Sequence, residues 1–143
     1  MSYNHKSSMP RQKAIIDGSN SAYLQAPRER RANIKNISAV AKAVEKSGRD
    51  PVIIIDPSIR SLLVDVDEFE RLMSDSRLMT VPAGRDMNHF VLETAEKLNA
   101  VIVSNYTYVE YYEEYPWVEE RRIPVAIVDG SVILLDAKMK RAS

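Results

Sequence analysis

Cysteine is absent from the 143 residues, so disulfide bonds, thiolate metal sites and a cysteine nucleophile are excluded. Histidine occurs only as His5 and His89, which argues against a zinc site built from several histidines. No apolar run approaches the roughly 18 residues that span a bilayer, and the amino terminus lacks the apolar core of a signal peptide. We therefore expect a cytoplasmic protein without a membrane partner.

Glycine is also scarce, with four residues, and no glycine-rich phosphate-binding motif is present. The sequence has neither the GxGxxG pattern of dinucleotide-binding folds nor the GxxxxGK[ST] pattern of nucleoside triphosphatases. The G-x-S-x-G turn that carries the serine of α/β-hydrolases is missing as well. Nucleotide-cofactor folds and serine hydrolases thus have no motif in their favour.

Acidic and basic residues balance, with twenty of each, but they are distributed unevenly. Residues 1–49 contain ten Lys or Arg and three Asp or Glu, so this third of the chain is basic. Four of these cations are candidates for holding an RNA backbone, because phosphate contacts depend on such side chains. A solvated surface explains them nearly as well. The four are Arg28, Arg30, Arg31 and Lys35.

Short apolar runs alternate with amphipathic stretches along a chain whose length suits one domain. This alternation predicts a doubly wound, three-layer α/β sandwich with a central parallel sheet. Asp129-Gly130 predicts a carboxyl-terminal β-hairpin. We expect a disordered leader at 1–12, the domain at 13–137 and a basic tail at 138–143. The expected strands are 13–16, 51–55, 78–81, 100–103 and 123–128. The expected helices are one that begins at Asn33 and ends before Gly48, a short one around 59–63, and those over 67–74, 87–98 and 106–115.

Polar residues follow three of the predicted strands. If these strands are parallel and adjacent, their carboxyl ends meet at one edge of the sheet, where ligands usually bind in open α/β folds. A helical turn after the last of them would bring Glu110 to the same place. An equally simple explanation for the first carboxylate is that it caps a helix. The polar residues are Asp17 and Asn20, then Asp86 and Asn88, then Ser104 and Asn105.

Carboxylates and amide oxygens without cysteine or several histidines suit a hard cation such as Mg²⁺ or Mn²⁺. Such an ion lowers the pKa of a bound water and neutralises a phosphate oxygen, which is the chemistry of phosphodiester hydrolysis. We therefore predict that Asp17, Asp86 and Glu110 are metal ligands. The candidate catalytic set adds Asn20, Asn88, Ser104 and Asn105 to these three.

Four short segments follow one another along the chain in a characteristic order: 15–20 (I-I-D-G-S-N), 82–92 (P-A-G-R-D-M-N-H-F-V-L), 102–105 (I-V-S-N), and 115–117 (Y-P-W) together with 121–124 (R-R-I-P). These segments resemble the NYN domains of the PIN-like nuclease superfamily, especially relatives of the Regnase-type (MCPIP-type) ribonucleases. The resemblance implies a PIN-like fold and a metal-dependent endoribonuclease that acts on single-stranded or looped RNA. It also implies a possible homodimer, because PIN-like domains often self-associate.

The chain departs from this family pattern at positions that are usually acidic. Asn88 and His89 stand where the relatives have paired acids, and Tyr106 stands where they have the Asp after Ser-Asn. An amide oxygen coordinates a metal but brings no negative charge, so the cation should bind weakly. Asp86 lies two residues before the expected carboxylate and replaces it only if the loop shifts.

Three functions therefore remain open. The first is the metal-dependent endoribonuclease, and the second is a catalytically impaired domain of the same fold that binds RNA or a protein. The third is a phosphatase-like enzyme on small phosphoesters. Dense aromatic residues at 106–117 suggest a platform for unpaired bases, with Tyr106 in contact with RNA, or alternatively burial against the sheet.

Overall fold

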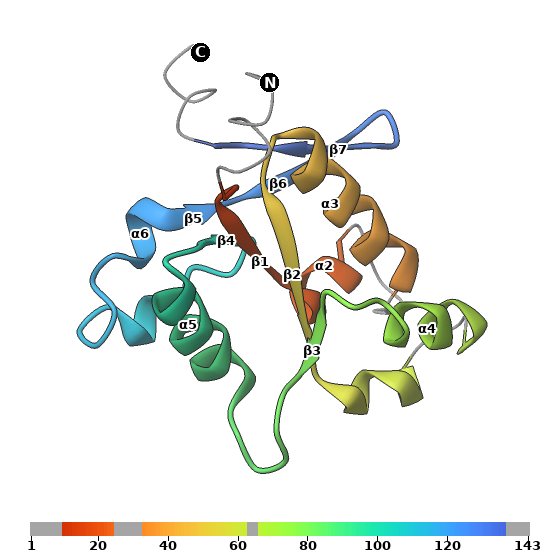
Figure 1. Ribbon diagram of the computed structural model, residues 1–143, viewed down its shortest axis with the longest axis horizontal. Coiled ribbons are helices and arrows are strands. Elements are labelled where there is room, and N and C mark those ends of the chain that lie inside the picture. Colours follow the sequence, from red (N-terminus) through yellow and green to blue (C-terminus); the bar gives the residue numbers. More distant parts are fainter. Residues whose placement is uncertain (1–9, 25–32, 63–65, 137–143) are drawn as a thin grey trace, which may run out of the picture.

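The computed structural model describes residues 10–24, 33–62 and 66–136 (Figure 1). Five parallel strands form a central sheet in the order β3-β2-β1-β4-β5, and β6 and β7 form a separate hairpin. The predicted α/β sandwich with a carboxyl-terminal hairpin is confirmed. The strands are β1 (Lys13–Asp17), β2 (Asp50–Ile55), β3 (Leu78–Thr80), β4 (Val101–Val103), β5 (Arg122–Ile123), β6 (Val125–Val128) and β7 (Ser131–Leu134).

Helices cover both faces of the sheet, as Figure 1 shows. The face that includes Ile16 packs against α2, α3, α4 and the hairpin, and the opposite face, which includes Ile15, packs against α5 and residues 106–118. Because side chains alternate along a strand, each buried strand supplies both cores, and its sequence is apolar throughout. The helices are α2 (Gly18–Ala22), α3 (Ile34–Lys46), η1 (Pro57–Leu62), α4 (Val66–Met73), α5 (Met87–Leu98), η2 (Val109–Tyr111) and α6 (Val118–Arg121).

Strand β1 lies at the centre of the sheet and sets the position of the site. Asp17, its last residue, pairs with Ile54 of β2, and the preceding Ile16 pairs with Val103 of β4. The chain segments that follow β1 and β4 therefore leave the sheet side by side. This is the edge at which the sequence predicted a site.

Most of the predicted elements are confirmed, and two expectations are wrong. The segment 106–115 was expected to be one helix, but its helical part is the single short turn η2, because Tyr108 has a left-handed backbone with φ of 57°. The strand expected over 123–128 is divided at Pro124 into β5 and β6. Proline has no N–H for the ladder, so the chain leaves the parallel sheet there.

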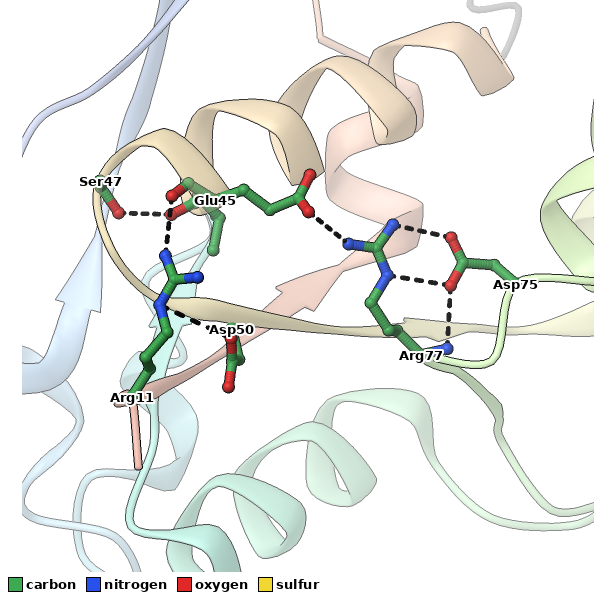
Figure 2. A network of polar contacts seen from close by, with 7 residues as sticks. Arg11, Glu45, Ser47, Asp50, Asp75 and Arg77 are labelled. Atoms are coloured by element: carbon green, nitrogen blue, oxygen red, sulfur yellow. Dashed lines mark hydrogen bonds and ion pairs between the residues drawn. The ribbon is translucent and has the colours of Figure 1, made fainter. Parts of the chain in front are cut away.

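The opposite edge of the sheet carries a polar network (Figure 2). The guanidinium of Arg77 donates to both carboxylate oxygens of Asp75, at 2.8 and 3.0 Å, and lies 3.0 Å from a carboxylate oxygen of Glu45 on α3. This pairing lowers the pKa of Asp75 to about 2. Arg11 donates to the backbone oxygens of Glu45 and Gly48 and so ties the described start of the chain to the end of α3.

A shallow cleft of about 430 Å³ lies beside this network, between the starts of β1 and β2 and the end of α5. None of its lining residues belongs to the predicted site. Among the described residues, no helix is both long and apolar enough to cross a bilayer.

Candidate functional site

Asp17 is the centre of the site, and its side chain is 3% exposed. One carboxylate oxygen accepts the backbone N–H of Asn20 at 3.1 Å, so Asp17 caps α2 as the local sequence allowed. The other oxygen accepts the hydroxyl of Tyr108 at 2.6 Å and that of Ser104 at 3.4 Å. Both oxygens of this buried carboxylate are thus engaged by protein donors.

Close packing against β2 requires glycine at position 18, directly after Asp17. A Cβ at this position would lie 2.5 Å from the backbone oxygen of Ile54, a contact that side chains essentially never make. The close approach lets α2 begin directly against β2. Gly18 is therefore a packing requirement of the motif.

Asn20, Ser104 and Asn105 connect the ends of β1 and β4. The side-chain oxygen of Asn20 accepts the backbone N–H of Asn105 at 2.9 Å. The side chain of Asn105 in turn donates to the backbone oxygen of Val125 and accepts its N–H, at 3.0 and 2.7 Å. These polar side chains hold three chain segments together, so the predicted catalytic roles of Asn20 and Asn105 compete with a structural role.

Asp86 begins α5 as its N-cap and faces the same rim. One of its oxygens accepts the backbone N–H of His89 at 2.9 Å and the hydroxyl of Tyr111 at 2.8 Å. These two hydrogen bonds hold the pKa of Asp86 below its usual value, and the bond from the backbone of His89 has the larger effect. The bond to Asp86 raises the pKa of Tyr111 to about 12, and Asn88 also bonds to this hydroxyl.

Glu110 lies on the short turn η2 and is exposed. It accepts the hydroxyl of Tyr106 at 2.5 Å, which lowers the pKa of Glu110 and raises that of Tyr106 to about 12. The negative charge of Asp86 offsets a small part of this lowering of the Glu110 pKa. The two carboxylates are therefore close enough on the rim to interact. The turn thus brings Glu110 towards the site as predicted, although by a different backbone path.

Tyr108 is the functional residue that the sequence reasoning missed. It is fully buried, its ring meets that of Tyr106 edge to face with 4.7 Å between centroids, and its hydroxyl reaches Asp17. Burial, followed by the charge of Asp17, raises the pKa of Tyr108 well above its usual value. The run of tyrosines is the available signal in the sequence, but it does not indicate which hydroxyls bond the acids.

His89 belongs to a neighbouring aromatic group rather than to the acidic rim. Its Nε2 lies 3.1 Å from the hydroxyl of Tyr115 and 3.3 Å from a carboxylate oxygen of Glu114. Tyr115 is buried, and its ring meets Trp117 edge to face. The aromatic residues of this segment are therefore packed into the core or onto its margin.

The structure gathers the predicted catalytic residues at one edge of the sheet, but not as a metal centre. Within the described ranges, no three His, Cys, Asp or Glu side chains are placed to hold a metal ion. The metal ligands Asp17, Asp86 and Glu110 therefore stay a prediction. Among the predicted RNA contacts, Lys35 is exposed in the first turn of α3 and Tyr106 is half-buried, whereas Arg28, Arg30 and Arg31 lie outside the described residues.

The parallel sheet order and the polar strand ends define a PIN-like α/β domain. A family model described as "Zc3h12a-like Ribonuclease NYN domain" matches residues 10–143, so the chain belongs to this family. Membership supports an RNA-cleaving activity in general terms. A comparison with curated proteins found no match.

Two solved structures of the nuclear protein-only RNase P 2 (PRORP2) of Arabidopsis thaliana share the fold. Their TM-scores are 0.69 and 0.70, with 20% and 21% sequence identity. The alignments cover 93% and 96% of this chain but 31% and 32% of the plant chains. The chain thus corresponds to about a third of the length of these relatives.

Proposed function

We propose that this domain binds RNA at the carboxyl-terminal rim of its sheet and that its capacity for metal-dependent cleavage is impaired. The ribonuclease family supports RNA as the ligand. One observation carries the proposal: each of Asp17, Asp86 and Glu110 already accepts a tyrosine hydroxyl. This is the catalytically impaired alternative that the sequence left open.

Mg²⁺ or Mn²⁺ does not fit the residues in this arrangement. A hard cation needs free carboxylate oxygens and usually one or two protein carboxylates in direct contact. Asp17 is buried with both oxygens occupied, and the described residues contain no cluster of three ligating side chains. Asn88 and Tyr106 add no negative charge where relatives of the family carry acids. We therefore derive no hydrolytic step through a metal.

The acidic rim by itself repels phosphate, so the RNA backbone requires cations beside it. Lys35 fits this role, because α3 begins next to α2: the N–H of Asn33 donates to the backbone oxygen of Ala22 at 2.7 Å. Lys35 is exposed, and Tyr106 offers part of its ring for stacking. The predicted contacts of Arg28, Arg30 and Arg31 would extend this surface.

A metal-dependent endoribonuclease is the second candidate. The position of Asp17 at the end of the central strand favours it, because Asn20 and Ser104 bond this carboxylate and Asn105 bonds Asn20 beside it. On this alternative, cleavage of RNA is lost in EDTA and in Asp17→Asn. Localisation in the cytoplasm and a homodimer stay predictions under either candidate.

The two candidates are separated by one labelled single-stranded RNA, measured for binding by fluorescence anisotropy and for cleavage on a gel. We expect equal binding in EDTA and in Mg²⁺, affinity that falls with salt, and no cleavage. Lys35→Glu should weaken binding and reduce the salt slope by about one. Lys42→Glu is the matched control, since it makes the same charge change about two turns along the same exposed helix face.

Cleavage that requires a divalent ion and disappears in Asp17→Asn would decide for the second candidate. Binding that does not respond to salt, or no binding at all, would contradict an RNA ligand for this domain.

A further inference from the structure

The three acids of the rim share a feature that family membership does not account for: their hydroxyl partners all come from one segment. Tyr106, Tyr108 and Tyr111 lie on residues 105–111, which follow β4 and fold back across the end of β1 and the start of α5. We call these seven residues the tyrosine cover. Their hydroxyls bond one carboxylate within the segment, one on β1 and one on α5.

The tyrosine cover is fixed in place by contacts that do not involve the acids. The ring of Tyr108 is completely buried in the core on the α5 side of the sheet. Asn105 holds both backbone groups of Val125, and Arg122 donates to the backbone oxygen of Ser104 at 3.1 Å. These anchors at both the start and the middle of the segment make it a part of the packed domain.

A tyrosine hydroxyl and a cation compete for the same carboxylate lone pairs. The hydroxyl satisfies an acid oxygen without adding positive charge, and a hydrogen bond to an ionised group is among the stronger ones. A cation that took these same oxygens would have to displace Tyr106 from Glu110 and Tyr111 from Asp86. It would also have to reach Asp17 through the buried Tyr108.

We propose that the tyrosine cover takes the place of a metal ion in this site, so that its hydroxyls join the acidic segments and exclude divalent cations. The inference rests on the proposed function, because both start from the tyrosine hydroxyls that occupy the acids of this rim. It implies that the site assembles without a metal, and that removal of the exposed hydroxyls restores binding of a hard cation.

The test is a titration with Mn²⁺ alone, without RNA. Binding is monitored by calorimetry and by paramagnetic broadening of backbone amide signals. We expect no saturable binding by the wild type at millimolar Mn²⁺. The double variant Tyr106→Phe/Tyr111→Phe should bind Mn²⁺ about a hundredfold more tightly than the wild type, since it releases two hydrogen bonds and each corresponds to roughly tenfold in affinity. Broadening should centre on Asp86 and Glu110.

Tyr112→Phe is the matched control, because Tyr112 is a half-buried tyrosine directly after the tyrosine cover and has no described bond to a carboxylate. It should behave as the wild type. Saturable Mn²⁺ binding by the wild type that is lost in Asp17→Asn would overturn the proposal, and so would a double variant that binds no better than Tyr112→Phe. Because no RNA is present, either result is independent of whether the domain binds RNA.

Discussion

The bond between Tyr108 and Asp17 provides the sharpest quantitative prediction. Tyr108→Phe removes one hydroxyl from a fully buried ring and leaves the ring in place. The lost partner is a buried carboxylate at 2.6 Å, and hydrogen bonds to charged groups contribute about 1.5–3 kcal/mol. The free energy of unfolding should fall by this amount, which for a domain of this size corresponds to a decrease in Tm of roughly 4–10 °C.

The assay is urea unfolding followed by far-ultraviolet circular dichroism, with a thermal scan on the same samples. Tyr112→Phe is the control and should change the free energy of unfolding by less than about 0.5 kcal/mol. A double-mutant cycle with Asp17→Asn isolates the pair and should give a coupling energy of about 1 kcal/mol or more, because the two groups share a buried contact. A Tyr108→Phe variant as stable as the control would refute the reasoning.

Three further predictions concern the remainder of the domain. Gly18→Ala should destabilise the fold by about 1–3 kcal/mol, measured by urea unfolding, because the added Cβ meets the backbone oxygen of Ile54 at 2.5 Å. The pKa of Asp86, measured by carboxyl NMR titration, should lie below 3.8 and should rise in Tyr111→Phe, since that hydroxyl helps to hold it down. Asp75 should titrate near pH 2, and its depressed pKa stabilises the fold above about pH 4. This contribution should disappear as the pH falls through 2, which is measured by comparing the acid unfolding of the wild type with that of Asp75→Asn.

The sheet could be predicted from the sequence because its strands are buried on both faces. The runs 52–55 and 101–103 are continuously apolar, which distinguishes them from the amphipathic helices between them. Asn33 and Asp86 act as N-caps, and Asp129-Gly130 forms the hairpin turn with positive φ at both residues. In each case the local sequence is sufficient, because a cap or a turn depends on side chains only a few residues apart.

The segment after β4 could not be predicted in the same way. Tyr108, Tyr111, Tyr112 and Tyr115 repeat at the spacing of a helix face, which is compatible with the helix expected over 106–115. In the structure, Tyr108 instead adopts a left-handed backbone that sends its ring into the core and its hydroxyl to Asp17, ninety-one residues earlier. That conformation is imposed by a contact distant in sequence, which overrides the local pattern.

The candidate site, too, could be predicted from the sequence only in part. Parallel strands bring Asp17, Ser104 and Asn105 together, and this followed from the order of the elements. The donors that occupy each acid did not follow, because a hydroxyl at the end of a tyrosine ring can reach any of several neighbours. Tyr106 was recognised as the replacement of a family acid, but its bond to Glu110 appears only in three dimensions.

The most direct measurement of the central claim is a crystal of the domain soaked in Mn²⁺ and recorded at a wavelength that gives an anomalous signal from manganese. We expect no anomalous peak at Asp17, Asp86 or Glu110 and an intact bond between Tyr108 and Asp17. A peak bridging these carboxylates, with the tyrosine hydroxyls displaced, would contradict the claim.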